Sequence, residues 1–76
     1  PKPIIFSVRE KSEQLLGLLR KNGHMSLGSM FGICKSRSEL VATFLSVLEL
    51  CSDGHIRVSG EEGNYDVSRA LTDTEE

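Results

Sequence analysis

Two cysteines and two histidines are the residues of this 76-residue chain best suited to nucleophilic or metal chemistry. Zinc sites and thiol redox sites usually hold their ligands in short paired motifs such as Cys-x-x-Cys. Cys34 and Cys51 are separated by sixteen residues, and no histidine lies near them at a spacing suited to zinc. We therefore expect no metal and no cofactor. Both thiols are expected to be reduced and buried among apolar neighbours, with a disulfide as the alternative.

Catalytic chemistry has equally little support in the sequence. His24 and His55 each lie beside a turn marked by glycine, where a histidine is more often solvated or capping a helix end than acting as a base. No local motif pairs a serine or cysteine with a base. The segment Gly60 to Gly63 has the composition of a hairpin turn and not of a phosphate-binding loop. We assign no catalytic residue and expect the chain not to be an enzyme.

Composition limits the classes of protein that remain. Hydrophobic residues make up 38% of the chain, which suits one small domain whose core is only marginally stable by itself. The net charge of -2 argues against a partner held mainly through its phosphates. We find no signal peptide and no apolar run of membrane-spanning length, so a cytoplasmic location is the default expectation. Because the sequence begins at Pro1, we expect a domain excised from a longer protein.

A capping box and a glycine stop mark the first helix. Ser7 followed by Glu10 allows the hydroxyl and the carboxylate each to accept from the other residue's backbone amide. Apolar residues then recur at helical spacing until Asn22 and Gly23, where glycine favours the left-handed conformation that ends a helix.

Two further helices are predicted downstream. The second, over residues 29–34, is short, and Gly28 and Gly32 weaken it, so we expect it to form only by packing on the rest of the domain. A second capping box, Ser36 and Glu39, opens a long third helix. The apolar residues of this third helix are Leu40, Val41, Phe44, Leu45, Val47, Leu48 and Cys51.

Strands are predicted where polar and apolar residues alternate, at 24–27, 56–59 and 65–68, the last two joined by a turn over 60–64. This order of elements predicts an α+β, mainly α fold: a winged helix-turn-helix with three helices and a C-terminal two-stranded wing hairpin. We expect this domain to occupy 7–68.

The remaining residues are expected to lie outside the domain. Residues 1–6 are expected to form an extended segment that leads into it, because Pro3 disfavours helix and Ile4, Ile5 and Phe6 favour strand. Residues 69–76 are expected to form a flexible acidic tail.

Many winged helices bind DNA, and the exposed side chains of the third helix and the wing test that function. A helical wheel places Ala42, Ser46 and Glu49 on the outward face of the third helix, with Thr43 at its border. None of these residues is basic. We therefore expect a domain that does not bind DNA directly. Because it has no apolar run of membrane-spanning length, we also expect no membrane partner.

The wing gives the same indication. Its tip carries Glu61 and Glu62, which phosphates would repel. The cations that remain are scattered along the chain: Lys35, Arg37, Arg57 and Arg69. A DNA-binding transcription regulator is the alternative function that we favour less.

The apolar residues of the third helix, Leu50 included, spread over more than the roughly 100° stripe that a core-facing helix requires. One explanation is that a central helix of a tiny domain is packed on several sides. Another is that a partner protein covers one edge of the helix, with Ala42 and Ser46 permitting close approach. A third is a homodimer in which the spare apolar edge pairs with itself. Spacing alone does not choose among them.

The segment from Ser36 to Leu50 closely resembles the C-terminal domain of bacterial segregation and condensation protein A, the kleisin subunit of the SMC condensin complex. The likeness extends over 6–67, and its most specific part is Val41-Ala42-Thr43-Phe44-Leu45. Supporting matches are Ser7-Val8-Arg9-Glu10-Lys11, Met30-Phe31, Glu61-Glu62 and Asp66-Val67.

The resemblance implies a non-enzymatic winged helix that docks on the ATPase head of an SMC protein. Docking would help to close a ring that acts in chromosome condensation and segregation, in the cytoplasm and at the nucleoid. The full-length protein would also bind the small accessory subunit of the complex. The protein interface that we assign combines the resemblance with the outward face of the third helix, and core packing is the competing role for its members. These residues are Ala42, Thr43, Phe44, Ser46, Leu48, Ile56 and Val58.

Overall fold

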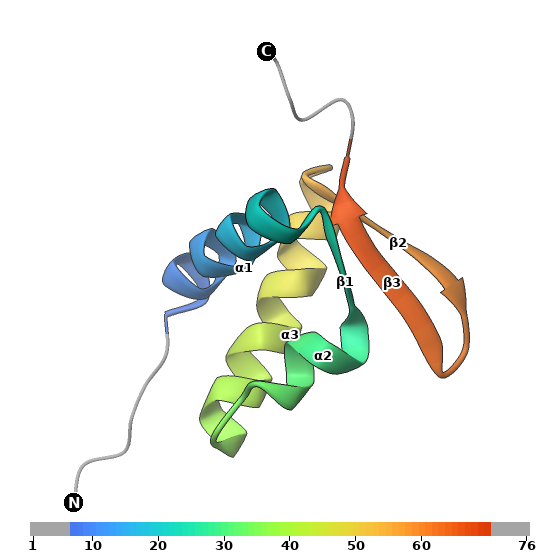
Figure 1. The fold of residues 1–76 in the computed structure, drawn as a ribbon. Helices are drawn as coiled ribbons and strands as arrows, with labels where there is room; N and C mark the ends of the chain where they lie inside the picture. The colour runs from blue at the N-terminus through green and yellow to red at the C-terminus, as the bar shows by residue number, and fades with distance from the viewer. Residues whose placement is uncertain (1–6, 71–76) are drawn as a thin grey trace, which may run out of the picture.

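The computed structural model describes residues 7–70, whose arrangement is shown in Figure 1. Its elements are α1 (Val8–Asn22), β1 (His24–Ser26), α2 (Leu27–Gly32), α3 (Arg37–Ser52), β2 (Ile56–Glu61) and β3 (Asn64–Arg69). Over this range the chain forms three helices and one three-stranded antiparallel sheet, which confirms the α+β class. The extended segment expected at 1–6 lies outside the described residues.

The predicted serine caps open α1 and α3. The Ser7 hydroxyl accepts from the Glu10 amide at 3.2 Å, and the Ser36 hydroxyl accepts from the Glu39 amide at 3.1 Å. The Glu39 carboxylate accepts from the amide of Lys35 at 2.9 Å, one residue before the donor that a capping box uses. The serine caps therefore place both helix starts correctly, whereas the Glu39 carboxylate bonds a different amide from the one that a capping box uses.

Helix α2 begins two residues earlier than the sequence predicts. The Ser26 hydroxyl accepts from the Ser29 amide at 3.0 Å and thereby caps a helix that starts at Leu27 and ends at Gly32. Met30 of α2 is fully buried, so this glycine-containing helix packs into the core as expected.

The sheet has the order β1-β3-β2, and β3 pairs antiparallel with both neighbours. Met25 and Val58 both lie opposite the buried Val67. The strands of the hairpin are longer than predicted, and the turn shortens to Glu62 and Gly63, where Gly63 has φ 84°. The short strand of the N-terminal half thus completes a sheet that is larger than the expected two-stranded hairpin.

The C-terminal boundary of the fold also differs from the prediction. Arg69 belongs to β3, and the Ala70 amide donates to the His55 carbonyl at 3.0 Å. Ala70 is buried at 7% exposure. The prediction that the flexible tail begins at residue 69 is therefore wrong for these two residues, because pairing with β2 and the bond to His55 hold them in place. The rest of the expected tail, 71–76, lies outside the described residues.

The core lies where α1, α2 and α3 meet one face of the sheet (Figure 1). Its buried members come from all three helices and from β2 and β3. The half-buried Met25 of β1 packs against them. They are Leu15, Leu19, Met30, Val47, Leu50, Ile56 and Val67. Burial of these side chains fixes α3 against both α1 and the sheet.

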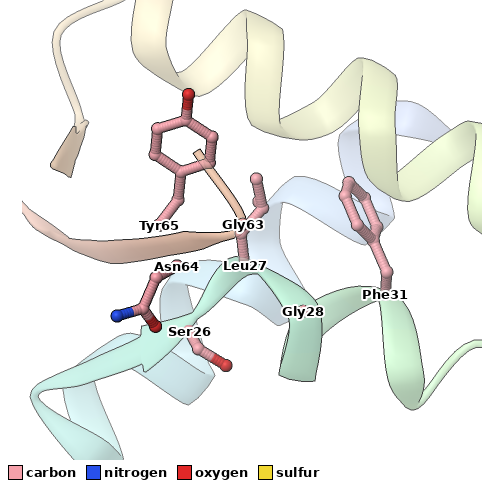
Figure 2. Close-up of a pocket in the computed structure, with 7 residues that line it drawn as sticks. All are labelled: Ser26, Leu27, Gly28, Phe31, Gly63, Asn64 and Tyr65. Carbon is pink, nitrogen blue, oxygen red and sulfur yellow. The ribbon is translucent and has the colours of Figure 1, made fainter. Parts of the chain in front are cut away.

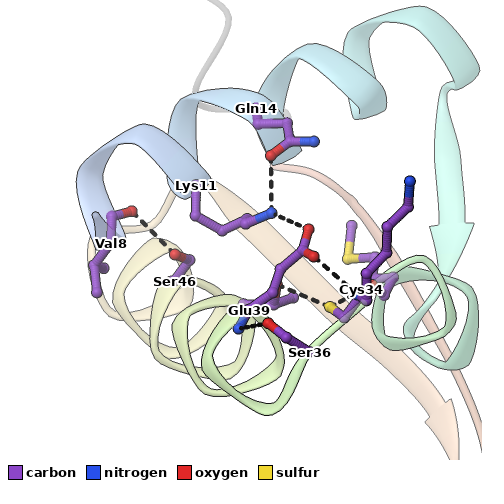
Figure 3. A network of polar contacts seen from close by, with 10 residues as sticks. Val8, Lys11, Gln14, Cys34, Ser36, Glu39 and Ser46 are labelled. Carbon is purple, nitrogen blue, oxygen red and sulfur yellow. Dashed lines mark hydrogen bonds and ion pairs between the residues drawn. The ribbon is translucent and has the colours of Figure 1, made fainter. Parts of the chain in front are cut away.

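A partly buried ion pair links α1 to the start of α3 (Figure 3). The Lys11 side chain is only 4% exposed, and its ammonium donates to Glu39 at 2.8 Å and to Gln14 at 2.9 Å. The hydrogen bond from Lys11, followed by the one from the Lys35 amide, lowers the pKa of Glu39 below its ordinary value of 4.5. Glu39 therefore holds together the cap of α3 and its contact with α1.

This ion pair predicts how stability depends on pH. Since the folded-state pKa of Glu39 is lowered, its carboxylate stabilises the fold above pH 4.5, and the contribution is lost as the pH falls through the lower value. In Lys11→Met, the free energy of unfolding should therefore decline less steeply below pH 4.5 than in the unaltered chain. Urea unfolding at a series of pH values measures this difference. Lys21→Met, at an exposed position of α1, should retain the original decline; an unchanged decline in Lys11→Met would contradict the assignment.

Candidate functional site

The most unusual surface of the structure is on α3. Five of its large apolar side chains are between 41% and 51% exposed. They are Leu40, Val41, Phe44, Leu45 and Leu48, and we call them the apolar face. Large exposed apolar areas of this kind often mark binding surfaces in folded proteins.

The buried side of α3 carries the core residues Val47 and Leu50 together with three small residues. Ala42 is 5% exposed, Thr43 1% and Ser46 0%. The Ser46 hydroxyl donates to the Val8 carbonyl of α1 at 3.0 Å (Figure 3). Thr43 forms a hydrogen bond with the Cys34 thiol at 3.2 Å. The prediction that Ala42, Thr43 and Ser46 lie on or beside the outward face is therefore wrong.

The reason is the close packing of α1 on α3. Small side chains let two helix backbones approach closely, and their hydroxyls find hydrogen-bond partners across the contact. A helical wheel that places small polar residues toward solvent therefore exchanges the buried and exposed sides of such a helix. The apolar face is left outside because the small-residue side is already covered.

The seven residues assigned to the interface fall into two groups. Phe44 and Leu48 lie on the apolar face, each 51% exposed and accessible to a partner. Ile56 is buried at 5% exposure and belongs to the core, together with Ala42, Thr43 and Ser46, while Val58 is half-buried against that core. Core packing, the competing role, therefore describes most of the set.

Three residues of the apolar face were missed by the assignment of the interface: Leu40, Val41 and Leu45. The sequence contained a signal for these residues. The apolar residues of this helix form two neighbouring rows in which residues are spaced four apart. These rows exceed what one core contact can bury. The helical wheel places this apolar excess on the wrong side of the helix.

A depression of about 310 Å³ opens at one end of the apolar face, lined by Phe31, Leu40, Val41 and Phe44. The rings of Phe31 and Phe44 lie 6.4 Å apart, tilted by 41°, in the range of favourable aromatic pairs. No polar side chain lines it. The depression is suited to an apolar side chain from another polypeptide.

A second depression, of about 260 Å³, lies between the start of α2 and the hairpin (Figure 2). The residues that line it are Ser26, Leu27, Gly28, Phe31, Gly63, Asn64 and Tyr65. Its polar side-chain groups are the hydroxyls of Ser26 and Tyr65 and the amide of Asn64. No histidine, cysteine or carboxylate lines it.

The cysteines differ from their expected environment. Cys34 is half-buried and its thiol donates to the Met30 carbonyl at 3.6 Å, whereas Cys51, in the last turn of α3, is exposed. Both are free thiols, so the expectation of burial is wrong for Cys51. Within residues 7–70, no group of three or more histidine, cysteine or carboxylate side chains lies close enough to hold a metal ion.

An exposed pair of side chains has an arrangement suggestive of acid–base chemistry. His24 Nδ1 lies 3.0 Å from Asp66 Oδ1, across the β1–β3 pairing. Ser26 and Ser29 line the same shallow depression, but their hydroxyls bond to each other at 2.8 Å and Ser26 caps α2. The imidazole therefore has an orienting carboxylate but no hydroxyl positioned to act as a nucleophile.

Charged side chains lie around the apolar face and not on it. Arg37 and Glu49 are exposed near opposite ends of α3, and neither forms an ion pair within residues 7–70. The apolar face thus has a charged side chain near each end of α3, and polar residues at the edge of an apolar surface are common in protein interfaces. Glu61 and Glu62 are exposed at the tip of the hairpin.

Comparison of the chain with protein-family models, curated proteins and solved structures finds no match. Among residues 7–70, no helix has the length and apolar character needed to cross a membrane. The candidate site therefore stands on its geometry alone.

The buried contact of Ser46 predicts an effect on stability. Ser46→Ala removes the hydrogen bond to the Val8 carbonyl and should lower the free energy of unfolding by about 1 kcal/mol. Ser38→Ala, at an exposed position of the same helix, should change it by less than about 0.5 kcal/mol. Urea unfolding of both variants measures the difference, and equal effects would contradict the structural role of Ser46.

Proposed function

We propose that this chain is a winged-helix module of the kleisin type, which docks on the ATPase head of an SMC protein and helps to close the SMC–kleisin ring. The order α1-β1-α2-α3, followed by the antiparallel hairpin β2-β3, supports the winged-helix part of the proposal. The resemblance of the segment Ser36 to Leu50 to the segregation and condensation protein A family supports the choice of partner.

The observation that carries the proposal is the apolar face. In winged helices that read DNA, the third helix presents polar and basic side chains to the groove. Here the solvent side of that helix carries five half-exposed apolar side chains. Such a surface gains free energy by contact with another apolar surface and gains none from phosphates.

The charges of α3 and of the hairpin support a protein partner further. Arg37 is the one cation of α3, and the hairpin tip carries Glu61 and Glu62. Carboxylates at the tip of a wing would repel the phosphates that a DNA-binding wing contacts. A partner held mainly by apolar contacts fits this distribution.

The free energy that burial of the apolar face can supply suits a module that docks reversibly. Burying the exposed half of five large apolar side chains is worth on the order of 4 to 7 kcal/mol before the cost of association. Phe44 and Leu48, each 51% exposed, have the most to gain in such a contact. They are the residues that we assign as anchors.

Phe44→Arg provides the test of this function. The substitution places a charge at the centre of the apolar face and should weaken binding to the head of an SMC protein at least about tenfold. Because Phe44 is half exposed, the variant should keep its helical circular dichroism. Isothermal titration calorimetry with the purified head domain measures the affinity.

Glu13→Arg, on the exposed side of α1, is the matched control, and it should bind the head as the unaltered chain does. Separate elution of the unaltered chain and the head in size-exclusion chromatography at micromolar concentration would contradict the proposal. A salt-sensitive mobility shift of duplex DNA by the chain would instead support the DNA-binding alternative.

A further inference from the structure

The exposed side of α3 consists of two parallel rows of residues spaced four apart. The first row is Leu40, Phe44 and Leu48, and it is symmetric about Phe44. The second row is Arg37, Val41, Leu45 and Glu49, which runs from a cation through two apolar residues to an anion. Rows of this spacing form the ridges by which helices pack on one another.

Each row is complementary to the same row read in the opposite direction. In an antiparallel pair, Leu40 of one helix lies opposite Leu48 of the other, and Phe44 lies opposite Phe44. The second row then places Arg37 opposite Glu49 and Val41 opposite Leu45. The centres of the two rows differ by one residue, about 1.5 Å along the axis, so one twofold axis serves both.

Arg37 and Glu49 each lie near the end of α3 at which an isolated helix favours the opposite charge. Arg37 is the first residue of α3, at the positive end of the helix dipole, and no basic residue lies in the last turn. Glu49 borders a depression with Arg9 and Glu13, which pair with each other at 3.8 Å. In an antiparallel pair each Arg37 would approach Glu49 and the negative end of the opposite helix, which would relieve both unfavourable placements.

The shape of the face is self-complementary as well. The depression lined by Phe31, Leu40, Val41 and Phe44 lies toward the N-terminal half of α3, and Leu48 projects from the C-terminal half. A twofold axis through Phe44 brings Leu48 of each copy to the depression of the other. Closed symmetric pairs require this kind of match between a surface and itself.

From these observations we infer that the apolar face also binds a second copy of this chain, with α3 packed antiparallel on α3 about an axis at Phe44. The five side chains offer on the order of 500 Å² per copy, less than the roughly 800 Å² of a standard interface. The pair is therefore weak and forms at high micromolar concentration. It uses the surface of the proposed function but does not depend on that function being correct.

Charge reversal at the two ends of the second row tests the arrangement. Sedimentation equilibrium in a reducing buffer, which keeps the exposed Cys51 from cross-linking, should show the unaltered chain dimerising between roughly 10 µM and 1 mM. Arg37→Glu and Glu49→Arg, each alone, should raise the dissociation constant of the dimer about tenfold, since each creates two like-charge contacts.

The two single variants should restore binding when they are mixed, because every contact in the mixed pair joins opposite charges. The double variant R37E/E49R should dimerise like the unaltered chain for the same reason. Both single substitutions place charges that suit the helix dipole, so neither variant should unfold at lower urea concentration than the unaltered chain.

A chain that stays monomeric at 1 mM overturns the inference. If the chain dimerises and neither charge reversal raises the dissociation constant, the dimer does not use this face. If both single variants dimerise weakly and mixing them does not restore binding, the antiparallel arrangement is wrong. None of these measurements contains an SMC protein, so a failure here leaves the proposed docking on the head untouched. If both hold, adding the head should dissociate the pair, because one surface cannot serve both.

Discussion

The close contact between α1 and the small-residue side of α3 determines which surface this protein presents to solvent. Ser46, fully buried, donates to the Val8 carbonyl, and Ala42 and Thr43 line the same side of the helix. The ion pair between Lys11 and Glu39 reinforces the contact at the start of α3. Val47 and Leu50 of α3 pack into the core, whereas the five side chains of the apolar face, on the side away from α1, remain outside.

A helix that is apolar on both sides is usually found in the interior of a larger assembly. Helix α3 is covered by α1, α2 and the sheet on one side and is open on the other. Leaving five half-exposed apolar side chains in water forgoes several kcal/mol of stabilisation that a small domain would otherwise gain. Such a loss is expected where another polypeptide supplies the missing contact, and both a partner protein and a second copy would do so.

The sequence predicted the elements of this fold better than it predicted their orientation. The serines that cap α1 and α3 and the glycine at the end of α1 act locally, so residue identity was sufficient to place those helix ends. The start of α2 was missed because Ser26 caps that helix without the acidic residue that signals a capping box. The outward face of α3 was missed because it depends on α1, whose position no local pattern in α3 encodes.

The position of β3 has a consequence for the synthesis of the protein. This strand is the last along the described residues, yet it lies between β1 and β2 and pairs with both. A nascent chain on the ribosome therefore exposes Met25 and Val58, which both face Val67, until residue 67 has left the exit tunnel. Helices α1 and α3 are able to form as they emerge, whereas α2 and the sheet assemble only after nearly the whole domain has been translated.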